Sequence, residues 1–564
     1  MTPPALSFDK YYTYAELTAA MQQLAAAYPK LAKVYSVGQS PEGRELWLME
    51  LTNSDTGSAS HKPGYYADGN HHAGEVTGSM VALYMINQLL TGYEHDGKLR
   101  QLLDDYVFYI LPRVSPDGSE VYLTTPDTLR SAPRHYPWSE PQPGLHAADV
   151  NGDGEILLMR VKSPLGEWKA ADSDPRLMQK RLPDEDEGEY YRLYTEGYIE
   201  GDAKLPIKLA PHKWGLDLNR NYPCEWGLES RQPGAGAYPL SEPETRAVAD
   251  FVLAHPNIAS VVTFHTTGGV ILRPPGTCPE KQAPQRDVAM FKAIGEMATV
   301  ETGYPCCNIF DEFLQDSVNF SSGAFDDWLY QHLGVPAYTV ELWDLASRAG
   351  VQVWPRKPKT DQEQSEDYAK ILAWIDQEMG GEGFVPWTPF EHPQLGAVEI
   401  GGFQVKELVQ NCPPRFLAEE CQKSARFCYR QAKTMPKVML ADVQTVRVDE
   451  HTWKVSALVQ NSGYLPTFLT QSALDQKTAK PVKARVAVSE GARVQSCVEI
   501  EVGHLEGRAG RASFFANGSF RTGKELPSEK AVHWIISGAQ AGDEVTVIAE
   551  SEKGGTVSQT ISLV

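Results

Sequence analysis

The chain is predicted to pass from a short strand into a helix at Tyr65-Tyr66-Ala67-Asp68-Gly69-Asn70-His71-His72-Ala73-Gly74-Glu75. Because His72 and Glu75 stand three positions apart, the first turn of that helix can aim both side chains at one metal ion. By itself the pair more often marks a helix N-terminus with a favourable acid in its first turn. His71 competes with His72 on spacing alone. A zinc site therefore needs a further ligand from elsewhere in the chain.

Strand-like and helix-like segments alternate around this junction, from about residue 9 to about residue 380. The apolar runs that predict strands are 46–51, 106–111, 260–264 and 337–342, and the runs that predict helices are 14–28, 73–90 and 362–378. Strands that alternate with helices predict an α/β fold with a mixed central β-sheet flanked by helices.

Changes in composition divide the chain into parts. We expect one domain at 1–385, interrupted at 119–212 by a long polar insertion of the kind that forms loops over a functional face. Residues 386–435 are predicted to be a linker that contains one helix. From 436 to 564, short Val-, Thr- and Ile-rich runs alternate with turn residues, which predicts an all-β, sandwich-like domain.

Length, charge and cysteine content disfavour several classes of protein. The 564 residues exceed one ordinary core, and the formal net charge of -21 would repel nucleic acid and anionic membrane surfaces. The sequence contains no run of about 18 apolar residues, so no membrane span is predicted. The N-terminus lacks a basic region followed by an apolar run, so we expect a cytoplasmic protein. The eight cysteines include no Cys-x-x-Cys pair, which disfavours a thiolate zinc site.

Polar side chains also accompany later segments of the predicted domain. His265 follows the strand at 260–264, at the sheet edge where functional residues of open α/β sheets gather. Glu341 lies inside an apolar strand, where a carboxylate is costly unless it is paired or bound. It predicts either a salt bridge or a general base with a raised pKa. Asn219 and Arg220 place an amide beside a guanidinium, a pair that suits a carboxylate or simply stabilises a loop.

In chain order these residues form four motifs. The motifs are His72-x-x-Glu75, Asp217-Leu218-Asn219-Arg220-Asn221, His265-Thr266 and Thr339-Val340-Glu341. In kind and order they resemble the motifs of the zinc carboxypeptidase family, which includes pancreatic carboxypeptidases A and B. The resemblance covers about residues 10 to 380, and it implies a zinc exopeptidase.

The resemblance implies a role for each motif residue. The implied zinc ligands are His72, Glu75 and His265, which leaves a fourth position for water. Glu341 would be the general base, and Asn219 with Arg220 would bind the terminal carboxylate of a peptide or protein substrate. This implies a zinc-dependent metallocarboxypeptidase. One alternative is a zinc amidohydrolase on the same scaffold that acts on a non-standard amide, such as a deacylase or a cell-wall peptide amidase. Another is an inactive binding protein, which the intact residue set disfavours.

Two further assignments depend on less regular segments. The family uses an arginine upstream of the Asn-Arg pair to stabilise the oxyanion, and Arg160 is the candidate here. The insertion also offers rival arginines, namely Arg134, Arg176 and Arg192. An ungapped count around Asp327-Trp328 places Asp326 at the floor of the specificity pocket, where an acid would favour substrates that end in Lys or Arg.

Residues 149–154 match the first half of a calcium loop. Asp149, Asn151 and Asp153 occupy positions 1, 3 and 5, and Gly154 occupies position 6. Position 12 is Arg160 in place of the usual Glu, so no standard EF-hand is expected. The sequence leaves two alternatives open, a calcium site and an Asx-rich turn.

Overall fold

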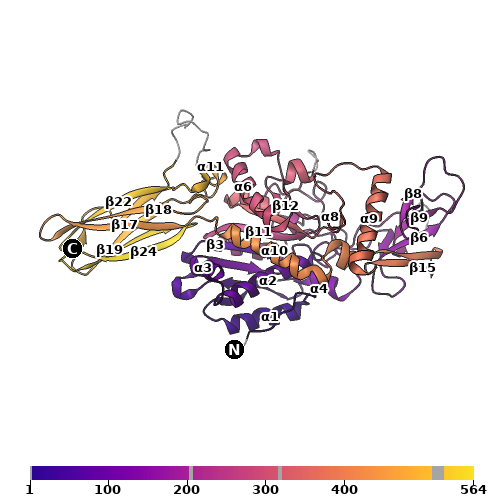
Figure 1. Cartoon of the computed structure of the whole chain (residues 1–564), viewed down its shortest axis with the longest axis horizontal. Helices are drawn as coiled ribbons and strands as arrows, with labels where there is room; N and C mark the ends of the chain where they lie inside the picture. Colours follow the sequence, from indigo (N-terminus) through magenta and orange to yellow (C-terminus); the bar gives the residue numbers. More distant parts are fainter. Residues whose placement is uncertain (1–2, 202–206, 315–319, 511–525) are drawn as a thin grey trace.

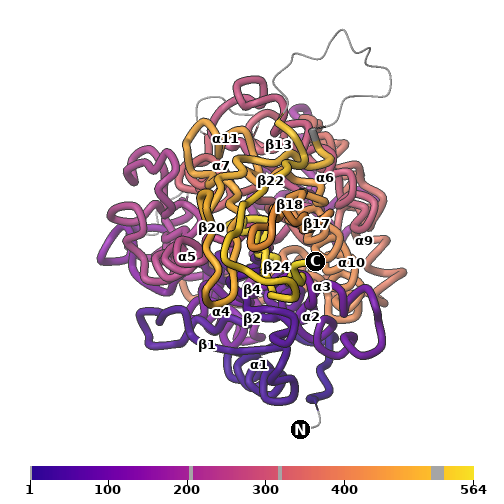
Figure 2. Tube along the Cα trace, turned by 90° about the vertical axis from the view of Figure 1, so that its left-hand side faces the viewer, coloured from indigo at the N-terminus to yellow at the C-terminus, as the bar shows by residue number. Residues whose placement is uncertain are grey.

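The computed structural model describes residues 3–201, 207–314, 320–510 and 526–564. Figure 1 shows an α/β body in the middle, an all-β domain at one end and a small lobe of strands at the other. Figure 2 looks along the molecule from the all-β end, with that domain in front of the α/β body. None of the helices in the described ranges has the length and apolar character needed to cross a membrane.

The α/β body is built on an eight-stranded sheet of mixed direction, which confirms the predicted fold class. The strand order is β1-β2-β4-β3-β11-β14-β12-β13. Their bounds are β1 (Ala32–Gln39), β2 (Glu45–Leu51), β3 (Gly64–Gly69), β4 (Val107–Leu111), β11 (Ile258–Thr266), β12 (Val270–Arg273), β13 (Cys306–Asn308) and β14 (Ala337–Leu342). Strands β4, β3, β11 and β14 run parallel, so their carboxyl ends meet at one edge of the sheet.

Helices flank this sheet, and their ends follow local sequence signals. The helices are α1 (Tyr14–Ala27), α2 (Val76–Gly92), α3 (Gly97–Asp105), α4 (Pro116–Thr124), α5 (Pro243–Ala254), α6 (Gln285–Thr302), α7 (Phe325–Leu333), α8 (Leu345–Arg348), α9 (Asp361–Met379) and α10 (Pro414–Ala432). Capping boxes begin two of them, Thr13 with Glu16 at α1 and Thr360 with Glu363 at α9. Every residue of β3 and β11 is buried. Strands that are covered on both faces have nearly continuous apolar sequences, and these two are mostly apolar for that reason.

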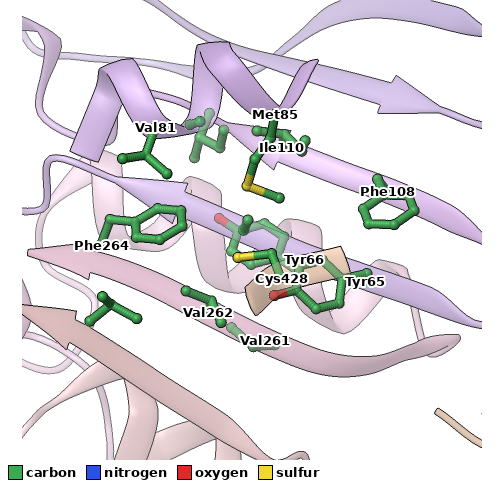
Figure 3. Packing of buried hydrophobic residues seen from close by; sticks show 14 of the residues in the cluster. Tyr65, Tyr66, Val81, Met85, Phe108, Ile110, Val261, Val262, Phe264 and Cys428 are labelled. Carbon is green, nitrogen blue, oxygen red and sulfur yellow. The ribbon is translucent and has the colours of Figure 1, made fainter. Parts of the chain in front are cut away.

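Close packing of α2 on the sheet fixes the start of that helix. Figure 3 shows Val81 and Met85 of α2 packed over the strands. Gly69 of β3 and Gly78 of α2 allow the approach, because a Cβ atom added to Gly69 would lie 2.7 Å from the backbone of Gly78. The loop between β3 and α2, which carries the His-x-x-Glu motif, is therefore held at the carboxyl edge of the sheet.

The polar insertion forms more than the loops expected of it. Its strands join a later hairpin in an antiparallel sheet of order β15-β16-β6-β9-β7-β8, here called the satellite sheet. The bounds are β6 (Leu158–Lys162), β7 (Trp168–Ala170), β8 (Met178–Lys180), β9 (Tyr191–Thr195), β15 (Phe384–His392) and β16 (Gly396–Phe403). A separate strand pair, β5 (Gly144–Ala147) and β10 (Gly197–Glu200), lies beside it in the insertion. The satellite sheet is the lobe at the far end from the all-β domain in Figure 1.

Residues 386–435 differ from the linker that the sequence suggested. The hairpin β15–β16 belongs to the satellite sheet, and α10 packs against α2 and α6 in the main core, where Leu417 and Cys421 are fully buried. Local sequence patterns could not predict that this hairpin joins the satellite sheet, because Glu399 of β16 pairs with Arg160 of β6, which stands 239 positions earlier.

The C-terminal domain is all-β, as predicted. It contains two four-stranded sheets, of order β17-β18-β22-β20 and β21-β19-β23-β24. The bounds are β17 (Val438–Arg447), β18 (Thr452–Asn461), β19 (Val482–Val488), β20 (Arg493–Val494), β21 (Glu499–Gly503), β22 (Glu529–Ser537), β23 (Glu544–Ser551) and β24 (Gly555–Ser562). Trp453 and Trp534 are fully buried in its core.

This domain contacts the α/β body at the edge opposite the carboxyl ends of the parallel strands. Lys553 Nζ donates to the carbonyl oxygen of Ile258, at the start of β11, over 2.9 Å. Asp287 in the first turn of α6 accepts hydrogen bonds from the backbone N–H groups of Gln471 (2.7 Å) and Ser472 (3.0 Å). The C-terminal domain is therefore attached to the sheet away from the edge where the motif residues gather.

Candidate metal centre and active site

Three buried side chains converge at the carboxyl edge of the central sheet. His72 and Glu75 come from the loop before α2, and His265 comes from the end of β11. His72 Nδ1 lies 2.8 Å from Glu75 Oε1, His265 Nδ1 lies 2.8 Å from Glu75 Oε2, and the two Nδ1 atoms are 3.0 Å apart. Within the described ranges this is the one group of three or more His, Cys, Asp or Glu side chains that could hold a metal ion.

The chemistry of this group fits zinc. Two imidazole nitrogens and one carboxylate are among its usual ligands, and three protein ligands leave a coordination position for substrate or water. Burial by itself would raise the pKa of Glu75, but His72 and His265 hold it well below its ordinary value. The carboxylate is therefore ionised and ready to bind a cation.

A second layer of polar groups orients His72. Its Nε2 atom lies 3.0 Å from Asp217 Oδ1, so Nε2–H donates to that carboxylate and Nδ1 is left to face a metal. Arg130 Nε donates to Asp217 Oδ2 over 2.9 Å, and Arg130 Nη1 lies 3.3 Å from Glu75 Oε1. Since 44% of the Arg130 side chain is exposed, this guanidinium can reach both the metal ligands and an incoming molecule.

The structure does not bring Arg160, the sequence candidate for the oxyanion, to this site. Arg160 lies in β6 of the satellite sheet, where Nε donates to Glu399 over 2.9 Å. Its guanidinium also stacks on the rings of Tyr191 and Trp387, at 4.8 and 4.7 Å from their centroids. The rival arginines have other places as well: Arg134 pairs with Glu242 and Glu244, Arg176 pairs with Asp174 and Asp376, and Arg192 lies in β9. Arg130, which also belongs to the insertion, lines the site instead.

Glu341 stands beside the metal-ligand group on the neighbouring strand. It pairs with His265 in the parallel register of β14 and β11. Burial raises the pKa of Glu341 to about 8, with a further contribution from the negative charge of Glu75. Among the residues that the structure describes, no salt bridge to Glu341, the other sequence alternative, is found. A carboxylate with so high a pKa is suited to proton exchange near neutral pH.

Asn219 and Arg220 form the opposite wall of the site. They belong to the short 3-10 helix η3 (Leu218–Arg220), which Asp217 caps by accepting a bond from the N–H of Asn219 over 2.9 Å. Asn219 Oδ1 accepts a bond from the backbone N–H of Phe325 over 2.8 Å, which orients the amide. Arg220 Nη2 lies 3.3 Å from Ser321 Oγ.

These walls enclose a cavity of about 240 Å³. Its lining includes the metal-ligand group, the base candidate, Arg130 and the Asn-Arg pair, together with Asp326 and Asp327 from the first turn of α7. Asp326 is buried, and its Oδ2 accepts a bond from Thr339 Oγ1 over 2.7 Å. Burial, and then the charge of Asp326, raise the pKa of Asp327 to about 7. Asp326 thus lines the cavity, and its place at the floor of a specificity pocket stays a prediction.

The calcium hypothesis gains no support. The two carboxylate oxygens of Asp149 accept bonds from the backbone N–H groups of Gly152 (2.7 Å) and Gly154 (2.9 Å). Asn151 Oδ1 accepts a bond from the N–H of Asp153 over 3.0 Å. The side-chain oxygens therefore close an Asx-rich turn, which was the alternative interpretation of this loop.

Sequence reasoning missed Arg130, and a signal for it was present. Arg130 is the first arginine after the Ser115-Pro116-Asp117-Gly118 segment that begins α4, and it lies before the strands of the insertion. The backbone N–H of Ala73 bonds to the carbonyl of Arg130 over 2.8 Å, which ties this loop to the His-x-x-Glu motif. The short sequence distance from α4 indicated the arginine that lines the site better than an alignment across the insertion did.

The chain is similar in sequence to known proteins. The profile of the zinc carboxypeptidase family matches residues 17–154 and 173–363, and a domain of unknown function, DUF8731, matches residues 437–562. Carboxypeptidase B of Astacus astacus is 24% identical over 353 residues, which is 61% of this chain and 89% of that protein. Carboxypeptidase D of Drosophila melanogaster is 21% identical over 420 residues, which is 69% of this chain but 23% of that much longer protein. The crystal structure of carboxypeptidase A from Helicoverpa armigera is similar with a TM-score of 0.38 at 22% identity, over 66% of this chain and 74% of that one.

The family match extends over more than half of the chain, and it includes the segments that carry His72, Glu75, Asn219, Arg220, His265 and Glu341. This chain belongs to the zinc carboxypeptidase family.

Proposed function

We propose that the protein is a zinc-dependent metallocarboxypeptidase that hydrolyses the C-terminal peptide bond of peptides or proteins. The observation that carries this proposal is one cavity lined by three metal-ligand side chains, a carboxylate of raised pKa and an Asn-Arg pair. Zinc held by His72, Glu75 and His265 would polarise the scissile carbonyl and favour the ionisation of water.

Glu341 is suited to the proton transfers of such a hydrolysis. Its carboxylate accepts a proton from the attacking water and returns that proton to the leaving amine. A divalent ion held beside Glu341 would favour its ionised form and lower this pKa. A base with a pKa near the working pH can take up the proton and release it again.

Two arginine side chains supply positive charge, one for the scissile carbonyl oxygen and one for the terminal carboxylate of the substrate. Arg130, held by Asp217 and close to Glu75, faces the position where negative charge develops on the carbonyl oxygen. Arg220 lies on the opposite wall with Asn219, and its planar guanidinium can bind a carboxylate through two parallel N–H bonds. Recognition of a free carboxylate would restrict cleavage to the last residue of a chain.

A preference for substrates that end in Lys or Arg is part of the proposal. Asp326 and Asp327 lie in the same cavity as Arg220, so a basic side chain on the terminal residue would meet carboxyl groups. Asp326 is the better candidate, because each of its oxygens accepts one bond, whereas Asp327 Oδ1 already accepts bonds from both the backbone N–H of Gly276 (2.9 Å) and Gln331 Nε2 (3.1 Å). A charged hydrogen bond in a closed site contributes about 1.5 to 3 kcal/mol.

The proposed function is tested by mass spectrometry of a peptide library that varies in its last residue. Loss of one residue at a time from the C-terminus is expected, with no loss in the presence of a zinc chelator. Glu341→Gln should lower kcat by roughly 100-fold to 10,000-fold with an unchanged zinc content. Wild-type turnover by Glu341→Gln would contradict the assigned base. Cleavage confined to acylated amines or cell-wall peptides would favour the amidohydrolase alternative.

A further inference from the structure

Asp68 is a buried carboxylate that the proposed chemistry does not use. It lies in β3, fully enclosed, four residues before His72. Neither of its oxygens has a hydrogen-bond partner among the residues that the structure describes. A buried carboxylate without a partner is costly, so its presence behind the metal-ligand group calls for a physical reason.

Three side chains face this carboxylate. Thr263 stands opposite Asp68 on β11, because the two residues pair in the parallel register of the sheet. The Nδ1 atom of His71 lies 3.5 Å from Asp68 Oδ1. Burial raises the pKa of Asp68 to about 7, and the hydroxyl groups of Thr263 and Tyr66 limit that rise. The strand register thus sets Thr263, which carries a hydroxyl donor, beside the carboxylate.

Thr263 also faces a metal-ligand side chain. Its Oγ1 lies 3.4 Å from Nε2 of His265, and 3.4 Å from Nδ1 of His71. The other ring nitrogen of His265, Nδ1, points at Glu75 and His72 and is thus on the metal side. A neutral imidazole that binds a metal through Nδ1 carries its proton on Nε2. Thr263 Oγ1 is the acceptor in place for that N–H group.

The two histidines of the metal-ligand group are supported in different ways. His72 donates directly to the carboxylate of Asp217, which also pairs with Arg130. The nearest partner of His265 Nε2 is the hydroxyl of Thr263, and the carboxylate of Asp68 lies beyond that hydroxyl. Partners of this kind fix the orientation of a ligating imidazole and raise its basicity.

We propose that Thr263 and Asp68 form an outer anchor for His265, in which His265 Nε2–H donates to Thr263 Oγ1 and the Thr263 hydroxyl donates to the Asp68 carboxylate. The inference rests on the proposed metal centre. The anchor holds the imidazole with Nδ1 toward the ion. In turn, a divalent ion on the far side of His265 offsets the negative charge of Asp68, which explains why a carboxylate is retained at this buried position.

The anchor is tested with four variants of the full chain. Thr263→Val removes the hydroxyl at nearly constant volume, Thr263→Ser keeps it, and Asp68→Asn removes the charge. Ser260→Ala is the matched control, because it removes a buried hydroxyl from the same strand whose partner is Gln431 of α10. The measurements are the zinc dissociation constant, by competition with a chromophoric chelator, and the visible spectrum of the cobalt-substituted protein. Melting curves of the metal-free variants check that each one folds.

The anchor predicts zinc binding about 10-fold to 100-fold weaker in Thr263→Val and in Asp68→Asn, with altered cobalt spectra. Thr263→Ser and Ser260→Ala should bind zinc as the wild type does. Unchanged affinity in either Thr263→Val or Asp68→Asn would overturn the inference. An equal loss in Thr263→Ser and Thr263→Val would overturn it as well, because packing rather than the hydroxyl would then be responsible. If the wild-type chain itself bound no zinc, the proposed metal centre would fail, which separates that failure from failure of the anchor alone.

Discussion

Asp326 is the buried side chain that we propose sets the specificity of this site. Its carboxylate lies in the cavity with Arg220 and bonds to Thr339. Asp326→Asn keeps the shape and removes the charge, so the ratio of kcat/KM for peptides ending in Lys or Arg to those ending in Leu should fall roughly 10-fold to 100-fold. Steady-state kinetics on matched peptides measure this ratio. Asp327→Asn is the control and should have the smaller effect, and an unchanged ratio in Asp326→Asn would remove the specificity assignment.

Glu244 predicts a pH dependence of folding that is independent of the active site. It is fully buried in α5, and burial raises its pKa to about 7 although Arg134 acts to lower it. The folded protein therefore holds a proton that the unfolded chain releases near pH 4.3, so this group lowers the free energy of unfolding by about 1.4 kcal/mol per pH unit between about pH 4.3 and 7. Glu244→Gln should lack this slope.

Urea denaturation of both proteins without metal, at several pH values, measures the difference. The difference should grow with pH up to about 7 and stay constant above it. Parallel curves over the whole range would show that Glu244 is ionised in the folded protein.

At the residue scale, the ordered motifs predicted which side chains meet, because motif residues at strand ends are brought together by a parallel sheet. His72, Glu75, His265, Glu341, Asn219, Arg220 and Asp326 all line one cavity. Arg130 escaped prediction because its role depends on the path of a loop, and the insertion supplied other arginines of equal plausibility. Only the fold shows that Arg160 is held by Glu399 instead.

At the scale of elements, the contact between α2 and the central strands positions two of the three metal-ligand side chains. Gly78→Ala would place a Cβ atom 3.0 Å from Phe264 Cβ and 3.1 Å from the carbonyl oxygen of Phe264. Backbone on both sides limits the adjustment, so the variant should lose about 1 to 3 kcal/mol of stability and bind zinc more weakly. Gly97→Ala is the control, since nothing lies within 4 Å of its added Cβ. Equal stability of the two variants would contradict this account of the helix position.

The hairpin β15–β16 was not predicted, because it has no clear local signal and its partner strand is distant in the chain. Helices with capping boxes and strands with apolar runs carry local signals, and these appear close to where they were expected. The hairpin β15–β16 contains prolines and resembled a linker, because its pairing with β6 depends on residues 239 positions away. Local propensity cannot supply a pairing of that range.

For the whole molecule, the C-terminal domain is predicted to contribute stability rather than substrate recognition. Its contacts with Asp287 and Ile258 lie at the edge of the sheet opposite the cavity. Asp287→Ala removes an acceptor for the N–H groups of Gln471 and Ser472, which should cost about 1 to 3 kcal/mol and lower the melting temperature. KM for peptides should not change. Asp475→Ala, which removes an acceptor only for the side chain of Gln471, is the control, and a raised KM in Asp287→Ala would contradict this division of labour.

Arg220 and its neighbours are proposed to bind the free carboxylate of a peptide whose last bond is then hydrolysed. A pair of peptides distinguishes this mode of recognition from others: the same sequence ending in lysine, once with a free C-terminal carboxylate and once with a C-terminal amide. With the zinc-loaded protein, mass spectrometry should show the free acid losing its terminal lysine and the amide reacting roughly 100-fold more slowly or not at all, because the amide cannot form the charged bidentate bond. Equal rates for the two peptides, or cleavage at an internal bond, would contradict the account.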